Sequence, residues 1–191
     1  MLRFILLFLF TPLLLFSQVK VETPYFDVIY SEEKQQPLSV EYKVLCNSES
    51  ITFKRGGMGF YKNDSIVTSD DADYYKNEWD KGHLAPAADF NCDESALKST
   101  FTYLNCALQH KDLNRGTWKY LEDYVRKLAD TSEVKVKVDV IFKENSKRLP
   151  TGAVIPDGFR KTIWLNGNLF GIWYFPNKPA KELNVNLYRL K

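Results

Sequence analysis

The chain has 191 residues, a length that suits a single domain with a sizeable hydrophobic core. Hydrophobic residues make up 45% of the sequence and charged residues 26%, a composition that excludes an intrinsically disordered chain. The formal net charge is only +2, so overall charge does not by itself indicate a nucleic-acid partner, although it leaves room for a local basic surface.

The first segment has the pattern of a secretory signal peptide. Arg3 supplies a short positive region, and residues 4–16 are almost entirely apolar. This run is too short to span a bilayer comfortably, so we expect residues 1–17 to be cleaved and residues 18–191 to form one domain. The protein would then be secreted or periplasmic, without stable membrane association after cleavage. A retained membrane anchor is the alternative.

Export changes the interpretation of the three cysteines, Cys46, Cys92 and Cys106. An odd number permits at most one intramolecular disulfide and leaves one thiol over. We favour Cys92 with Cys106, because both flank the candidate site described below; three small buried thiols without a bridge are an equal alternative.

Strands and loops are expected in the first part of the chain. Residues 19–30 carry apolar and aromatic side chains typical of a strand or an extended arm. Residues 38–46 begin with the strict alternation of a half-buried strand, and residues 51–53 fit a short continuation. Residues 55–65 are rich in glycine and turn-forming residues, and the acidic residues 69–73 fit a short helix or a loop.

Helical and strand signals then follow one another. Residues 95–100 fit a short helix and residues 101–105 a strand. Residues 113–128 place apolar side chains three and four positions apart, which predicts an amphipathic helix.

The last part of the chain is strand material. Residues 134–140 alternate valine with charged residues, which is the period-two pattern of a strand. Residues 161–165 and 169–175 predict two strands joined by a hairpin turn at Asn166-Gly167-Asn168. Residues 183–190 fit an edge strand.

Two polar stretches carry the candidate chemistry. Residues 80–90, DKGHLAPAADF, contain His83, one of only two histidines, and residues 105–122, NCALQHKDLNRGTWKYLE, follow about thirty residues later. Cleavage of a phosphodiester needs a base for the attacking water, a cation to offset phosphate charge and stabilisation of the leaving oxygen. His83 can be the base, because a reference pKa of about 6.5 leaves imidazole largely neutral at pH 7.

Asn114 and Glu122 can complete such a site. Asn114 can bind Mg²⁺ through its amide oxygen, and one protein ligand can suffice because Mg²⁺ keeps several waters. Glu122 lies about two helical turns further on and roughly 80° around the helix, so we expect it to hold a metal-bound water. A helix cap at Asn114 and a solvated helix charge at Glu122 are the plain alternatives.

These stretches resemble the DNA/RNA non-specific endonucleases, the family of mitochondrial endonuclease G and the Serratia-type secreted nucleases. Residues 80–87, DKGHLAPA, resemble its D-R-G-H-x-x-P/A motif, and residues 105–122 resemble its N-x-x-P-Q…N-x-x-x-W-x-x-L-E segment. Residues 155–161, IPDGFRK, are similar to its V-P-x-x-F-x-K stretch, and Phe175-Pro176-Asn177 to its terminal P-N element.

The resemblance implies an α+β fold with a ββα-metal (His-Me finger) core on a mixed, mainly antiparallel sheet. It implies a metal-dependent endonuclease that hydrolyses DNA and RNA to 5′-phosphate ends, with Mg²⁺ or alternatively Mn²⁺ as cofactor. His83 would be the general base, Asn114 the metal ligand and Glu122 the support of its water shell. Lys81 and Asn105, which also lie in the motifs, are further catalytic candidates. The resemblance leaves the oligomeric state open.

The chain also departs from the family pattern. Lys81 replaces the family arginine, which keeps the charge but loses the bidentate fork toward phosphate. The family's upstream phosphate-contacting arginine has no secure match; Arg55 is the nearest candidate, Lys62 the second, and Arg115 is a further substrate-binding candidate. These departures leave two alternatives: a catalytically weak nucleic-acid-binding protein on the same fold, or a phosphodiesterase for another substrate.

Overall fold

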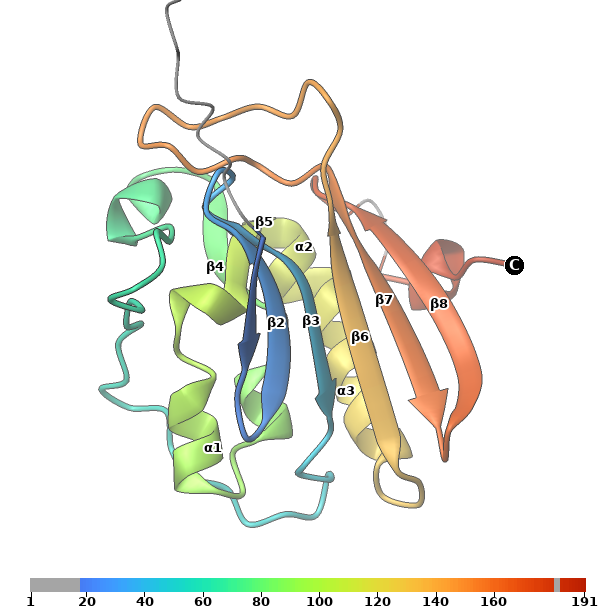
Figure 1. The fold of residues 1–191 in the computed structure, drawn as a ribbon. Coiled ribbons are helices and arrows are strands. Elements are labelled where there is room, and N and C mark those ends of the chain that lie inside the picture. Colours follow the sequence, from blue (N-terminus) through green and yellow to red (C-terminus); the bar gives the residue numbers. More distant parts are fainter. Residues whose placement is uncertain (1–17, 181–182) are drawn as a thin grey trace, which may run out of the picture.

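The computed structural model describes residues 18–180 and 183–191, so the predicted signal peptide, residues 1–17, lies outside the described residues. A six-stranded sheet, in the order β1-β2-β3-β6-β7-β8, stands beside a two-stranded ribbon, β4-β5 (Figure 1). Neighbouring strands are antiparallel in both. The α+β class with a mainly antiparallel sheet is therefore confirmed.

The elements occur in the following order. The strands are β1 (Gln18–Glu22), β2 (Phe26–Ser31), β3 (Gln36–Lys43), β4 (Trp79–His83), β5 (Cys106–His110), β6 (Val134–Ile141), β7 (Gly158–Leu165) and β8 (Asn168–Pro176). The α-helices are α1 (Glu94–Ser99), α2 (Lys111–Leu113) and α3 (Lys119–Leu128). None of these helices is both long enough and apolar enough to cross a bilayer.

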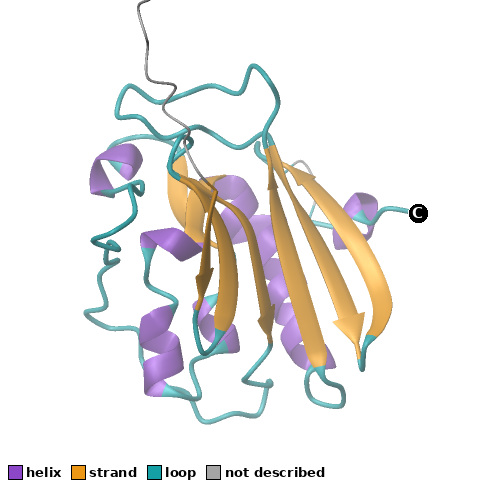
Figure 2. Ribbon diagram, viewed as in Figure 1, coloured by secondary structure: helices purple, strands orange, loops and turns teal. Residues whose placement is uncertain are grey.

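The helices α2 and α3 lie behind the large sheet, with α3 running behind β3 and β6, and α1 lies to the left of the strands in this view (Figures 1 and 2). Leu121 and Val125 form the apolar stripe of α3, and they pack with the buried valines of β6 in the main core. The opposite side of β6 carries the half-exposed Lys135 and Lys137, as the alternating sequence predicts. The sheet thus has one apolar and one polar face. The candidate residues Asn114 and Glu122 belong to the helical segment on the apolar side.

The hairpin between β7 and β8 forms where the sequence predicts it. Asn166 and Gly167 both adopt positive φ, 48° and 81°, which is the conformation that a tight two-residue hairpin turn demands. Residues 19–30, in contrast, form two strands, because Thr23 makes a turn in which its hydroxyl donates to Phe26 O at 2.7 Å.

Three expected strands are wrong. Residues 51–53 are an exposed loop, in which Ile51 is 90% exposed. Residues 101–105 run into a 3₁₀ turn, Tyr103–Asn105, so the strand begins only at Cys106. Residues 183–190 contain a 3₁₀ helix, Val185–Tyr188, and pair with β8 as strand only at an isolated bridge between Arg189 and Trp173.

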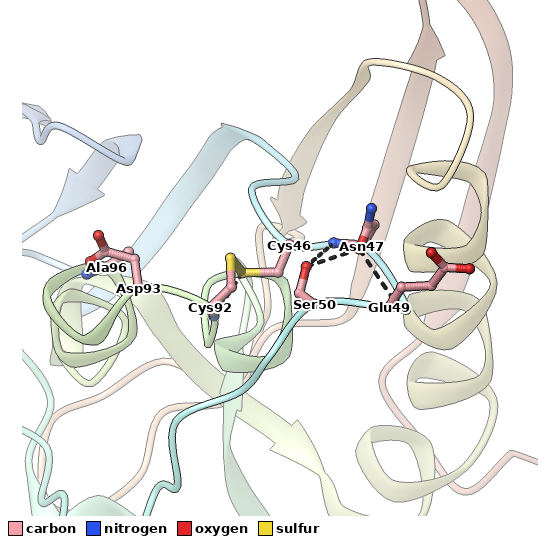
Figure 3. The surroundings of a disulfide bond; sticks show 7 residues. All are labelled: Cys46, Asn47, Glu49, Ser50, Cys92, Asp93 and Ala96. Atoms are coloured by element: carbon pink, nitrogen blue, oxygen red, sulfur yellow. Dashed lines mark hydrogen bonds between the residues drawn. A yellow bond between two sulfur atoms is a disulfide. The ribbon is translucent and has the colours of Figure 1, made fainter.

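The disulfide joins Cys46 to Cys92 and not Cys92 to Cys106 (Figure 3). The backbone explains the pairing, because the amides of Leu45 and Cys46 both donate to Asp89 O, at 3.0 and 2.9 Å, and bring the two segments together. Cys106 is instead a buried free thiol on β5. The bridge anchors the long loop after β3 to the segment that follows β4.

Candidate active site

A cavity of about 370 Å³ opens between the end of β4 and α3. His83, Asn114 and Glu122 all line it, although they are spread over the sequence. The complete lining is Arg55, His83, Pro86, Ala87, Ala88, Asn114, Arg115, Lys119, Glu122, Asp123 and Arg126. The structure therefore brings the three residues expected to form the centre of the site into one space.

His83 is the last residue of β4, and its ring is packed between two aromatic rings. The ring centroids of Phe60 and Phe101 lie 5.0 and 5.1 Å from the imidazole centroid. Nε2 is enclosed and has no hydrogen-bond partner among the described residues, which leaves Nδ1 as the nitrogen that can face the cavity. Burial, helped by the positive charge of Arg55, lowers the pKa of His83 to about 3, so the imidazole is neutral at pH 7.

The ribbon β4-β5 fixes the position of His83. Gly82 faces Gln109 so closely that a Cβ at this position would lie 2.5 Å from Gln109 Cβ, so only glycine fits. Beyond the strand, Asn105 holds the chain from inside. Its Oδ1 accepts from Ala85 N at 2.8 Å, and its Nδ2 donates to Ala85 O at 2.9 Å and Thr100 O at 3.0 Å. Asn105 is fully buried and lies outside the cavity lining, where it clamps the segment after His83.

Asn114 sits at the start of a π-helical turn, Asn114–Trp118, that precedes α3. The predicted helix over 113–128 is therefore interrupted, because Gly116 adopts a non-helical conformation with φ −104° and ψ −117°. Asn114 Nδ2 donates to Asp80 Oδ2 at 2.9 Å. No group among the described residues donates to its Oδ1, so the amide presents an available oxygen in a wall of the cavity.

Asp80 is itself held as a carboxylate. Burial tends to raise its pKa, but hydrogen bonds from Arg115 and Asn114 outweigh burial and leave the pKa below its usual value. Arg115 binds it with both Nε, at 2.8 Å, and Nη2, at 2.6 Å. The ionised Asp80 in turn fixes which way the Asn114 amide is oriented.

Glu122 is largely buried, with 14% of its side chain exposed. Burial raises its pKa to about 7, against the opposing charge of Lys161. Lys161 Nζ lies 3.6 Å from Glu122 Oε1 and 3.9 Å from the centroid of the Trp118 ring. Burial lowers the pKa of Lys161, and the carboxylate of Glu122 partly offsets that effect.

A second buried charge pair lies beside the first. Asp89 is fully buried, and Arg126 Nη1 donates to its Oδ1 at 2.9 Å. Sequence reasoning missed Asp89, Arg126 and Lys161. A usable signal existed for Lys161, because it occupies an inward position of β7 between Phe159 and Ile163, where the alternation calls for an apolar residue.

Lys81 points to the outside of this cavity. Its ammonium pairs with Asp71 and lies 5.1 Å from the centroid of Phe60, whose ring packs against His83. The rings of Tyr74 and Tyr103 surround it as well. Lys81 therefore contacts the ring of Phe60, which in turn packs against His83.

The three substrate-binding candidates differ in position. Arg55 lines the cavity. Lys62 lies outside the lining and pairs with Asp70 at 2.7 Å. Arg115 lines the cavity too, with its guanidinium engaged by Asp80.

Comparison with known proteins identifies the family of this chain. Residues 14–190 match the family model of the DNA/RNA non-specific endonucleases. The chain is 34% identical over 121 residues to the nuclease of Serratia marcescens, covering 58% of this chain and 45% of that protein. It is 38% identical over 65 residues to the mitochondrial nuclease EXOG of Danio rerio, covering 34% of this chain and 19% of that protein.

The fold agrees as well. The solved structure of an EndoG/EndoGI complex contains a chain that matches with a TM-score of 0.78 at 20% identity, covering 90% of this chain and 80% of that chain. The chain covers less than half of the length of these curated relatives, because the aligned regions span 45% of the Serratia marcescens protein and 19% of the Danio rerio protein. The family match spans nearly the whole sequence, and the chain therefore belongs to the DNA/RNA non-specific endonuclease family.

Proposed function

We propose that this protein is a metal-dependent endonuclease that hydrolyses phosphodiester bonds in both DNA and RNA. The observation that carries the proposal is the shared cavity, which combines a neutral imidazole, an available amide oxygen and a buried carboxylate. These are a base, a metal ligand and a group able to hold a water, which together are the parts that the reaction needs.

His83 takes a proton from the attacking water at Nδ1, which requires the other ring proton to reside on Nε2. Its pKa of about 3 in the free protein is low for this work. Burial is the main cause of this low pKa, and the charge of Arg55 is the smaller one; a phosphate entering beside Arg55 offsets the smaller cause and so raises the basicity of His83.

Asn114 would hold a divalent cation through Oδ1, because Asp80 orients its amide. Across residues 18–180 and 183–191, no three His, Cys, Asp or Glu side chains gather as a ready-made metal site. A cation at Asn114 thus keeps most of its waters, which suits Mg²⁺, with Mn²⁺ as the alternative. When bound, the cation supplies positive charge for the phosphate and the departing 3′ oxygen, which leaves a 5′-phosphate end. Glu122 would accept a hydrogen bond from a water bound to that cation.

Asn105 and Lys81 act through other residues. Asn105 clamps the segment after His83, and Lys81 supports the Phe60 ring against the imidazole. We further infer that residues 1–17 are a signal peptide, that residues 18–191 form one domain, and that the protein works in the periplasm or the medium. The disulfide supports this location, because such bonds persist in oxidising compartments.

The test is a nuclease assay on the purified mature protein. Plasmid DNA and RNA should both be degraded with Mg²⁺, and a chelator should stop the reaction. His83→Ala should lower the rate by about 10² to 10⁴-fold, the usual contribution of a general base. A thermal melt of the variant checks that it is folded, and full activity in folded His83→Ala would refute the role of His83.

The same assay separates the alternatives. Binding of nucleic acid without cleavage in Mg²⁺, Mn²⁺ and Ca²⁺ would favour the catalytically weak binding protein. Turnover confined to small phosphodiesters would favour a different substrate class.

A further inference from the structure

A second cavity, of about 410 Å³, lies on another side of α3, and four aromatic residues line it together with Arg189 and four residues of the segment 183–186. Tyr120 and Tyr124 of α3 form one wall, and Phe170 and Trp173 of β8 form another. Arg189 reaches in from the C-terminal segment. The residues invoked for the nuclease reaction do not include any of these five.

The rings and the guanidinium lie close together, with Trp173 itself buried beneath the others. The centroids of Tyr124 and Phe170 lie 6.2 Å apart. Arg189 Cζ lies 5.3 Å from the Phe170 centroid and 5.2 Å from the Trp173 centroid, and its Nη2 donates to Phe170 O at 2.5 Å. Tyr120 and Tyr124 are nevertheless 52% and 43% exposed, so the flat faces on α3 remain open to a ligand.

The second cavity adjoins the candidate active site through α3. Lys119 and Asp123 line the first cavity, and Tyr120 and Tyr124 follow them by one residue each, which places them 100° further around the helix. A helix with side chains is about 10 Å across, a distance that roughly three stacked nucleotides at 3.4 Å each can span. A strand with one phosphate in the first cavity can therefore bring its bases to the second.

Charge on the ridge between the cavities is largely neutralised. On α3 itself, Lys119 pairs with Asp123 at 2.6 Å, and Arg126 binds Asp123 as well. Attraction for the phosphate backbone is consequently weak there, so a strand that crosses α3 must gain its affinity from its bases. Aromatic faces with a neighbouring arginine suit this task, because every base has a face that can stack.

We propose that the second cavity is a subsite that stacks unpaired nucleobases of the strand whose phosphate occupies the first cavity. The ligand class is a single-stranded segment of DNA or RNA, a few nucleotides away from the bond that is cleaved. This inference rests on the proposed nuclease function for the position of the stacked bases relative to the cleaved bond. The stacking itself is measurable without cleavage.

The test compares Tyr120→Ala/Tyr124→Ala with wild type on two substrates. One is a 12-nucleotide single strand. The other is bis(p-nitrophenyl) phosphate, which is too small to reach from the first cavity to the second. The ratio of the KM for the long strand to the KM for the small diester should rise by about tenfold or more. Tyr120→Phe/Tyr124→Phe, which keeps both rings, should restore most of the ratio. Tyr75→Ala, at another tyrosine that is 68% exposed, is the matched control.

Binding provides the second readout. In a His83→Ala background, fluorescence anisotropy of a labelled 12-nucleotide strand should show about tenfold weaker binding after the double alanine substitution. Absence of cleavage by the wild type would count against the proposed function, while this binding measurement would still decide the subsite. Unchanged binding would overturn the inference, and so would an equal rise in both KM values. A dimer that dissociates on substitution would overturn it as well, because the tyrosines would then form an interface between copies.

Discussion

The two walls of the candidate active-site cavity are held by different forces. On the β4 side, His83 lies between aromatic rings and is kept in place by the uncharged clamp of Asn105. On the α3 side, Glu122 rests on buried charges, with Lys161 at 3.6 Å and the Asp89 pair beside it. One wall thus surrounds a neutral imidazole with apolar packing, and the other compensates a buried acid with a buried cation.

This difference has a physical consequence. Both groups lose hydration, and burial favours the uncharged form of each, so it lowers the pKa of His83 and raises that of Glu122. Only Glu122 has an opposite charge nearby to limit the effect. Substitutions in the first wall should therefore reduce stability through lost packing and hydrogen bonds. Substitutions in the second wall should reduce it by leaving a buried charge uncompensated.

The largest effect on stability should come from Lys161→Met. Removing the cation that forms the ion pair with Glu122 leaves a buried acid with only the more weakly acting Arg126 nearby, which should cost about 3 kcal/mol or more at pH 8. Urea denaturation measures the loss. Adding Glu122→Gln should recover much of it, whereas Lys135→Met on the open sheet face should change stability little. A Lys161→Met protein as stable as wild type would break the comparison.

Asn105→Ala should have the next largest effect, on the other wall. It removes three buried hydrogen bonds, and the unpaired backbone groups of Ala85 and Thr100 should cost about 2 kcal/mol in total. Because this clamp is uncharged, the loss should be the same at pH 5 and pH 8, unlike that of Lys161→Met. A loss that varied strongly with pH would assign Asn105 to the electrostatic wall instead.

The pH dependence of stability sharpens the contrast further. The folded-state pKa of His83, about 3, lies below its ordinary value of 6.5, so the unfolded chain binds the extra proton and stability rises as pH increases between these values. The folded-state pKa of Glu122, about 7, lies above 4.5, so the folded protein binds the extra proton and stability falls as pH rises from 4.5 to 7.

Two variants isolate these opposite slopes. His83→Gln should flatten the rise, and Glu122→Gln should flatten the fall, in curves of unfolding free energy against pH. Parallel curves for both variants and wild type would contradict the two burial effects.

The smallest expected effect is on the KM for DNA, and it should distinguish the surface cations Arg55 and Lys62. Arg55 lines the cavity and Lys62 does not, so Arg55→Ala should raise the KM for DNA about fivefold, the equivalent of about 1 kcal/mol for an exposed charge. Lys62→Ala should stay within about twofold of wild type. Steady-state kinetics at two salt concentrations would test this, and equal effects of the two substitutions would remove the distinction.

Regular local patterns were sufficient for much of the fold. The alternating valines of β6 and the Asn166-Gly167 turn each specify their structure within a few residues, and the structure follows them. The convergence of His83, Asn114 and Glu122 on one cavity was also predictable, because all three belong to recognisable motifs.

The features that sequence reasoning missed depend on long-range contacts. Residues 101–105 are apolar enough for a strand, but their backbone pairs with Tyr61 in the loop after β3 and then turns. The partner of Cys92 is set by hydrogen bonds from β3's end to Asp89 O. The inward position of Lys161 on β7 signals a buried cation, but its pairing with Glu122 joins a strand to a helix, and no local pattern identifies that partner.

The central claim is that one divalent cation lies between the Asn114 amide oxygen and His83. Diffraction at the manganese absorption edge, from crystals soaked in Mn²⁺, tests it directly. We predict one anomalous peak in the cavity, about 2.1 Å from Asn114 Oδ1, that disappears in Asn114→Ala. A peak bound elsewhere, with none beside Asn114 in the wild type, would contradict the account.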